Sequence, residues 1–177
     1  MAAATEDVKP SAPETFTFPD DGLIPNNPLP LILRRGAITP TAGDPARAFE
    51  ETFRRNGWSG TWRNGIYSFH HYHSTAHEVL GIAAGSAAVR FGGEGGATVA
   101  VGAGDVVVIP AGVGHKRIEA SPDLLVVGAY PGGMACDLIR ADPAAVVEAR
   151  RRIARVPLPD ADPVDGAGGM LVRLWRA

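Results

Sequence analysis

The stretch WRNGIYSFHHYHSTAHEVLG, residues 62–81, holds four of the five histidines of this chain of 177 residues. Its β-favouring residues predict a strand at 66–73, in which side chains two residues apart point to the same face. His71 and His73 therefore share a face and can reach one metal ion. Glu78 follows after a turn-prone Ser74-Thr75-Ala76, so it can return beside them on the next strand. This stretch predicts two imidazoles and one carboxylate around a cation.

A second stretch, IPAGVGHK at residues 109–116, carries the fifth histidine. The turn-forming residues 110–114 precede His115 and can present it from another strand. Three neutral imidazoles and one carboxylate are ligands that divalent iron, manganese, nickel, copper and zinc prefer. A His-x-His pair alone is equally typical of solvated or hydrogen-bonded histidines, so the residue types leave both interpretations open.

Short β-favouring runs separated by glycines fill the middle of the chain and predict an all-β sandwich or small barrel. No helical pattern of 10–15 residues interrupts these runs, which disfavours a parallel βαβ sheet. Two helices are predicted to flank the barrel, at 45–56 and 143–155, and a last strand is predicted at 170–175. The seven predicted strands are 66–73, 78–83, 87–91, 98–101, 106–109, 115–119 and 124–130.

The chain has the length of one domain, so residues 16–177 are predicted to form a single domain behind a mobile, polar tail at 1–15. A Pro-rich arm at 23–33 is predicted to cover a sheet edge, either of its own chain or of a partner.

Composition excludes several classes of partner. The formal net charge of −2 disfavours nucleic acid, and the apolar runs are too short to span a membrane. The single cysteine, Cys136, rules out an internal disulfide and a cysteine-based zinc cluster, and we expect an inert thiol. The opening residues include Glu6 and Asp7 and no apolar segment typical of a secretory signal, which predicts a cytoplasmic location.

The spacing of glycines, histidines and proline in the two stretches resembles the two signature motifs of the cupin superfamily. The matching residues are Gly65-x5-His71-x-His73-x4-Glu78-x6-Gly85 and Gly104-x5-Pro110-x-Gly112-x2-His115. The sequence of residues 62–81 is more similar still to small, single-domain bacterial YjlB-like cupins, a group of unassigned function. The resemblance implies a jelly-roll β-barrel with core motifs at 65–119, a metal ion held by His71, His73, Glu78 and His115, and a homodimer. Glu119 stands where the family usually has asparagine.

These residues predict one divalent transition-metal ion and an oxidoreductase of dioxygenase type, acting on a small oxygenated substrate that chelates the ion. Glu78 is expected to act in catalysis as well, by carrying a proton. Tyr67, Phe69 and Arg117 share the face of the ligands if their strands are regular, so they are expected to shape a substrate pocket. The alternatives are a non-redox metal-dependent isomerase or decarboxylase, and a non-catalytic cupin that binds or senses a small ligand.

Five further side chains have less specific interpretations. His70 alternates to the opposite face from His71 and is expected to be structural or solvated. His77 could compete as a ligand, although a contact outside the ligand set fits its spacing better. Trp58, Trp62 and Arg63 precede the first motif and are expected to pack in a loop.

Because an imidazole must be neutral to bind a metal, we expect the ion to be lost on acidification.

Overall fold

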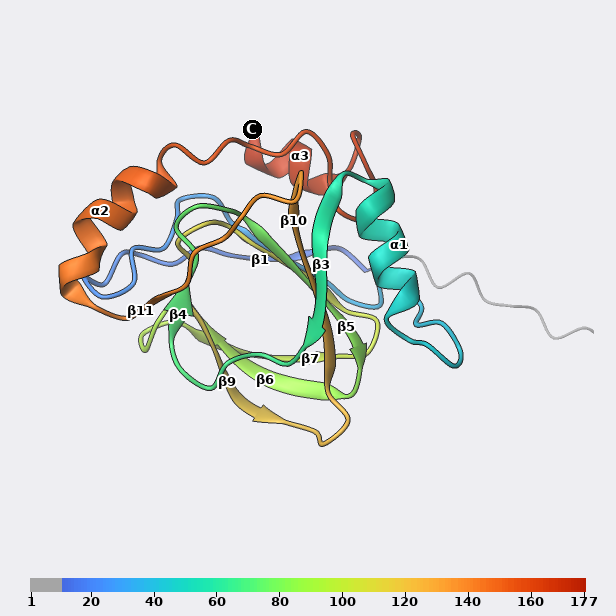
Figure 1. Cartoon of the computed structure of the whole chain (residues 1–177). Helices are drawn as coiled ribbons and strands as arrows, with labels where there is room; N and C mark the ends of the chain where they lie inside the picture. The colour runs from blue at the N-terminus through green and yellow to red at the C-terminus, as the bar shows by residue number, and fades with distance from the viewer. Residues whose placement is uncertain (1–10) are drawn as a thin grey trace, which may run out of the picture.

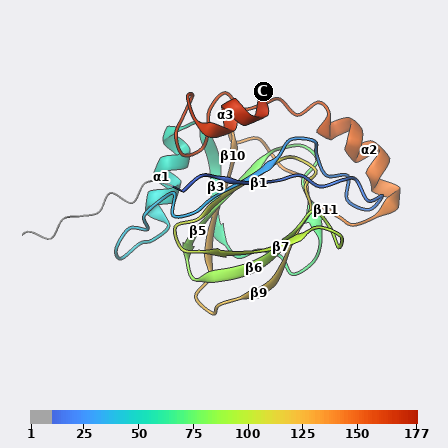
Figure 2. The same ribbon diagram turned by 180° about the vertical axis from the view of Figure 1, so that it is seen from behind.

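Two antiparallel sheets face each other and enclose a barrel (Figures 1 and 2). The computed structural model describes residues 11–177, which contain eleven strands and three helices. The all-β jelly-roll prediction is confirmed. The six-stranded sheet has the order β1 (Glu14–Phe16), β2 (Leu31–Arg34), β8 (Val106–Ile109), β5 (Glu78–Ala84), β10 (Leu125–Pro131), β3 (Trp58–Asn64). The five-stranded sheet has the order β11 (Ile139–Arg140), β4 (His71–Tyr72), β9 (His115–Ala120), β6 (Ser86–Phe91), β7 (Ala97–Gly102).

The central strands of the six-stranded sheet are buried on both faces, which is why β2, β5, β8 and β10 have mostly apolar sequences. Leu31 and Leu33 pack between the two sheets, whereas Ile32 between them in sequence packs on the outer face. The same alternation holds along β5 and β8. The outer face is covered by α1 (Arg47–Arg55) and α3 (Met170–Trp175), and so the barrel interior remains available for a site (Figure 1).

Helix α1 contacts the sheet through Phe49 and Phe53, which lie one turn apart and are fully buried. The helix lies so close that a Cβ placed on Gly81 of β5 would be 2.3 Å from the ring of Phe49. A glycine at position 81 therefore permits this packing. Helix α2 (Pro143–Ile153) begins with Asp142, whose side chain accepts a hydrogen bond from the backbone N–H of Ala144, and with a proline at its first position.

The structure corrects several predicted elements. Residues 170–175 form a helix and not a strand, because Leu171 and Trp175 are spaced one helical turn apart and both are buried against the outer face of the sheet. The predicted strand at 66–73 is reduced to β4, since residues 65–70 have no strand partner over that length. The two predicted helices are confirmed, with shorter bounds.

The segment that contains Trp58, Trp62 and Arg63 was predicted to be a packing loop, but it forms a strand. As β3 it pairs with β10 at the end of the six-stranded sheet. The arm at 23–33 covers a sheet edge of its own chain, where β2 pairs with β8. Of the predicted tail, residues 1–10 lie outside the described residues, and Glu14–Phe16 forms β1. Among residues 11–177 no helix has the length and apolar character to cross a membrane.

Candidate metal centre

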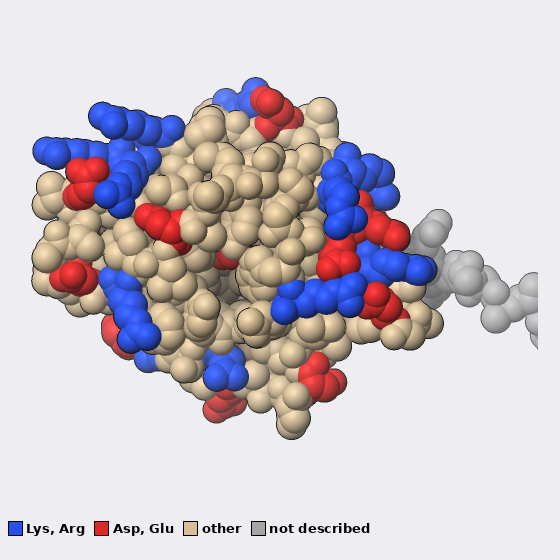
Figure 3. All heavy atoms as spheres, in the orientation of Figure 1, with Lys and Arg blue, Asp and Glu red and all other residues tan. Residues whose placement is uncertain are grey.

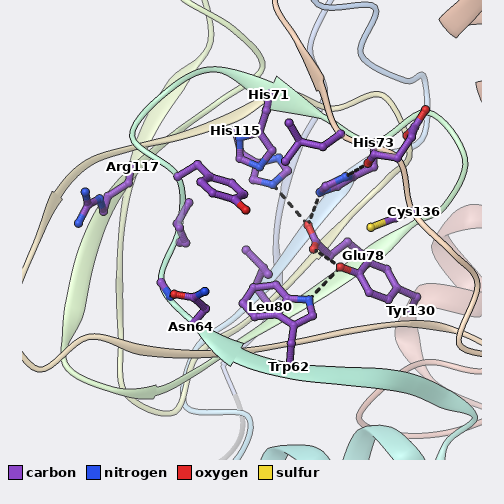
Figure 4. Close-up of a pocket in the computed structure, with 15 residues that line it drawn as sticks. Trp62, Asn64, His71, His73, Glu78, Leu80, His115, Arg117, Tyr130 and Cys136 are labelled. Atoms are coloured by element: carbon purple, nitrogen blue, oxygen red, sulfur yellow. Dashed lines mark hydrogen bonds and ion pairs between the residues drawn. The ribbon is translucent and has the colours of Figure 1, made fainter.

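Three histidines and one glutamate from different strands meet inside the barrel (Figure 4). His71 on β4 and His115 on β9 are direct partners across the antiparallel ladder, with ring centroids 4.0 Å apart. His73 lies one residue beyond β4, and Glu78 begins β5. The donor atoms of the three buried histidines all lie within 4.8 Å of one another. The structure thus brings the four predicted ligand residues together.

The orientation of each of these imidazoles is set by a backbone carbonyl, which faces its Nδ1 atom. A carbonyl oxygen only accepts hydrogen bonds, so each Nδ1 must carry a proton and donate it. In the neutral ring this leaves Nε2 without a proton and with a free lone pair, the state that binds metals. The carbonyls belong to Phe69 for His71 (3.1 Å), to Val113 for His115 (3.2 Å) and to Asp137 for His73.

The two carboxylate oxygens of Glu78 have different surroundings. Oε1 accepts a hydrogen bond from the hydroxyl of Tyr130 at 3.2 Å. Oε2 lies 3.2 Å from Nε2 of His73 and 3.3 Å from Nε2 of His115, but neither contact has the geometry of a hydrogen bond. Since Glu78 is only 3% exposed, Oε2 is a buried anionic oxygen without a well-aligned donor among the described residues.

The electrostatics of these groups favour a positive charge between them. Burial opposes ionisation of Glu78, but the imidazoles of His73 and His115 hold its pKa far below the usual range. Burial also opposes protonation of His73, but the charge of Glu78 and the hydrogen bond to the Asp137 carbonyl act against it, and the pKa of His73 is raised. Burial, together with the neighbouring His115, lowers the pKa of His71 to about 3. Glu78 and His73 thus each favour the charged form of the other.

This donor set fits a divalent transition metal. The donor atoms of the three histidines lie close together, and an unpaired oxygen of Glu78 lies against two of them, His73 and His115. Each imidazole is held by an outer hydrogen bond of the kind that accompanies metal-binding histidines. Three histidines and one glutamate leave coordination positions open on an octahedral ion. A structural zinc site is instead tetrahedral and closed. The four residues can thus hold a metal and leave room for a further ligand.

The four residues line a cavity of about 560 Å³ that opens at the surface. Figure 3 shows the hollow in the middle of this face, surrounded mostly by uncharged atoms, with the charged side chains toward the rim. Ile66 and Leu80 form an apolar part of the cavity wall. Trp62, Tyr130 and Cys136 also line the cavity. A cavity of this size accommodates a small molecule.

Of the three residues predicted to shape the pocket, two line the cavity and one does not. Tyr67 and Arg117 line the cavity, and Tyr67 is 53% exposed. Phe69 is not among the lining residues, because it stacks on Tyr67 and lies beneath the guanidinium of Arg140. Glu119 does not share the face of Arg117, since the pairing of β9 with β6 is interrupted by an irregularity that reverses the alternation there.

The two remaining histidines lie outside the centre. His70 contacts Glu94 at 2.7 Å in an exposed pair, as its expected place on the opposite face suggests. His77 is buried, but its Nδ1 accepts a hydrogen bond from the backbone N–H of Ala111 and its ring packs against Trp175 of α3. It is therefore not a competing ligand in this structure.

Three lining residues had no functional interpretation in the sequence: Trp62, Tyr130 and Cys136. Trp62 donates through Nε1 to the Tyr130 hydroxyl at 2.8 Å, and this hydroxyl in turn donates to Glu78. Burial, reinforced by the charge of Glu78, raises the pKa of Tyr130. Tyr130 ends a predicted apolar strand, so its parity could have placed it in the interior, but its contact with Trp62 depends on the pairing of β3 with β10.

Comparison with known proteins agrees with this geometry. Residues 61–129 match the sequence profile of the cupin family. The chain is also 43% identical over 163 residues to the uncharacterized protein YjlB of Bacillus subtilis strain 168, which covers 92% of this chain and 96% of that protein. The chain belongs to the cupin family.

Solved cupin structures resemble this cupin more distantly. Acireductone dioxygenase from Bacillus anthracis, solved with a cadmium ion in its active centre, is 15% identical with a TM-score of 0.36, over 52% of this chain and 63% of that one. Oxalate decarboxylase from Bacillus subtilis, which has Mn(II) centres, is 14% identical with a TM-score of 0.33, over 75% and 29% of the two chains.

Proposed function

We propose that this cupin binds one divalent transition-metal ion through His71, His73, Glu78 and His115. The observation that carries this proposal is the cluster of three histidines whose donor atoms lie within 4.8 Å of one another and whose rings are held by carbonyls at Nδ1. A buried Glu78 oxygen that lacks a hydrogen bond lies 3.2 Å from His73 and 3.3 Å from His115. Iron, manganese, nickel, copper and zinc all accept this set of ligands.

We propose further that the reaction is an oxidation of dioxygenase type on a small oxygenated substrate that chelates the ion. A bound redox-active metal supplies Lewis acidity and electron transfer at this centre. The protein would contribute the rest. Arg117 lines the cavity and pairs with no acidic side chain in the described part of the chain, so it can bind an anionic group. Ile66 and Leu80 would exclude water, and Glu78 would carry a proton during the reaction.

The first test is elemental analysis of the protein purified without added metal, with the metal content counted per chain. Oxygen uptake by the iron- and manganese-loaded protein is then measured with a panel of enediols and 2-oxo acids, aerobically and anaerobically. We expect one ion per chain and metal-dependent oxygen uptake with some members of the panel. Stoichiometric metal binding without oxygen uptake would contradict the dioxygenase proposal alone.

A second candidate is a non-redox isomerase or decarboxylase, and the Tyr130–Glu78 hydrogen bond favours it, because such a pair can hold a proton beside a substrate. Full activity with zinc would support this candidate, since zinc offers no redox change. A protein that binds no metal and is unaffected by replacement of His71 and His73 would instead be a non-catalytic module.

We also propose that the protein forms a homodimer, because of its resemblance to the family. We propose that it is located in the cytoplasm and binds a small molecule. The end of the arm at 23–33 pairs within its own chain, as strand β2. Light scattering of the purified protein measures the mass in solution, and a monomeric mass would contradict the dimer.

A further inference from the structure

Glu78 presents one oxygen to the histidines and the other to Tyr130 (Figure 4). A free carboxylate has two equivalent oxygens, and both can bind the same cation, in which case it occupies two coordination positions. In this cavity the two oxygens are not equivalent. Oε2 faces Nε2 of His73 and Nε2 of His115, while Oε1 accepts the hydroxyl proton of Tyr130 at 3.2 Å.

The direction of the Tyr130 hydroxyl is determined by Trp62. An indole N–H only donates, so the contact of Trp62 Nε1 at 2.8 Å occupies a lone pair of the hydroxyl oxygen. The single proton of the hydroxyl is then available for Glu78. Trp62 and Glu78 do not compete for the hydroxyl, because Trp62 donates a hydrogen bond to it and Glu78 accepts one from it.

The place of the Trp62 indole depends on Gly128, its direct partner across the ladder of β3 and β10. A Cβ at position 128 would be 2.1 Å from Cε2 of the indole, so any other residue would displace the ring. Trp62, Gly128 and Tyr130 are thus positioned together by the pairing of β3 with β10. Trp62 begins the stretch 62–81, whereas Gly128 and Tyr130 lie outside both stretches that carry the ligands.

We propose that Tyr130, oriented by Trp62, is a positioning residue that reserves Oε1 of Glu78, so that Glu78 binds a cation through Oε2 alone. This inference rests on the proposed metal site. A glutamate that binds through both oxygens would occupy two coordination positions. Binding through Oε2 alone therefore leaves one more position open for substrate. Tyr130 acts through Glu78 and need not contact the metal.

The test uses the full-length protein loaded with Mn(II), in Tyr130→Phe, Trp62→Phe and wild-type forms. Tyr72→Phe is the matched control, because Tyr72 is buried beside α2 and its hydroxyl has no hydrogen-bond partner in the described structure. The readouts are the Mn(II) count per chain, the EPR spectrum of the ion and the number of exchangeable water ligands from water-proton relaxation.

We expect Tyr130→Phe to keep one Mn(II) per chain but to change the EPR spectrum and to lose one water, which would lower inner-sphere relaxation by about half if an octahedral ion begins with two waters. Trp62→Phe keeps the hydroxyl but not its orientation, and we expect a smaller change in the same direction. Tyr72→Phe is expected to match the wild type.

Identical spectra and water counts in the wild type and in a folded Tyr130→Phe protein would overturn the inference while leaving the metal site intact. If Tyr130→Phe does not fold, as judged by circular dichroism, an unchanged spectrum in Trp62→Phe overturns it in the same way. A wild-type protein that binds no Mn(II) and no other divalent ion refutes the proposed function itself.

Discussion

Each histidine of the candidate centre is held by a contact to the backbone, and this decides which nitrogen is free. The carbonyls of Phe69 and Val113 lie two residues before His71 and His115, so these two contacts are local to the motifs. His73 is different, because the carbonyl of Asp137 is 64 residues away in sequence. The third ring therefore depends on a loop that closes over the site.

Replacing His115 by alanine tests the ligand set at the level of one residue. The variant lacks one nitrogen donor and leaves Glu78 Oε2 with a single imidazole neighbour, so we expect metal affinity to fall by more than about 100-fold, beyond the effect typical of residues outside the ligand set. Isothermal titration with Mn(II) measures this. His70→Ala is the control, since His70 pairs with Glu94 at the surface, and an equal loss in both variants would contradict the assignment.

The loop after β10 is the element that closes the centre. The carboxylate of Asp137 accepts from the backbone N–H of Ser74 at 2.6 Å and from its hydroxyl, and Thr75 accepts from the Asp137 N–H at 3.0 Å. Arg152 of α2 adds an ion pair at 3.7 Å. These contacts fix the carbonyl that orients His73, so a helix and a loop outside the ligand set control its geometry.

Asp137→Ala removes the side-chain contacts of this loop but keeps every proposed ligand. We expect metal affinity about 10-fold weaker, as for other groups that orient a ligand, with the metal count unchanged at saturation. Asp142→Ala, which affects the exposed cap of α2, serves as control and should keep wild-type affinity. Equal affinities for Asp137→Ala and the wild type would show that the loop does not orient His73.

The packing of α1 against the six-stranded sheet is a second property of elements. Gly81→Ala would place a methyl group 2.3 Å from Phe49, so we expect a loss of about 1–3 kcal/mol in the free energy of unfolding, as for other overpacked cores. Urea denaturation measures it. At Gly102 the nearest atom to an added Cβ is 4.0 Å away, so Gly102→Ala should be close to neutral, and equal stability of the two variants would refute this account of the packing.

For the whole molecule, α3 and the barrel are joined through the buried His77, whose ring packs against Trp175. Burial lowers the pKa of His77 to about 4. An unfolded chain would take up this proton near pH 6.5, so folding favours the neutral ring. The stability that follows is complete above pH 6.5 and is lost as the pH falls from 6.5 toward 4.

We therefore expect this group to reduce the free energy of unfolding by about 2 kcal/mol between pH 7.5 and pH 5 in metal-free protein. Urea unfolding at the two pH values measures the loss. His77→Asn retains an acceptor for the Ala111 N–H but does not titrate, so its stability should change less with pH. A variant with the same pH dependence as the wild type would exclude His77 as the source.

The chemistry of the candidate centre was predictable from the sequence, because it depends on local features. Two histidines two residues apart on a strand share a face, and the spacing to Glu78 and the turn before His115 lie within the two motifs. The six consecutive strands β5 to β10 were equally visible as β-favouring runs between turn residues, whereas β3 was expected to be a loop. The helix at 170–175 was not, because its six residues are too few to establish a period, and burial against α1 and the sheet decided its form.

The tertiary structure decided everything that joins distant parts of the chain. Trp62 meets Tyr130 and Tyr130 meets Glu78 across 68 and 52 residues, and no local pattern contains such pairs. Phe69 does not line the cavity as predicted, because alternation of side chains holds only along a regular strand and residues 65–70 do not form one. The sequence by itself determined which atoms can bind a metal, since donor chemistry belongs to the residue. The orientation of His73, and which oxygen of Glu78 is left free, came only from the tertiary structure, because these hydrogen bonds join residues far apart in the sequence.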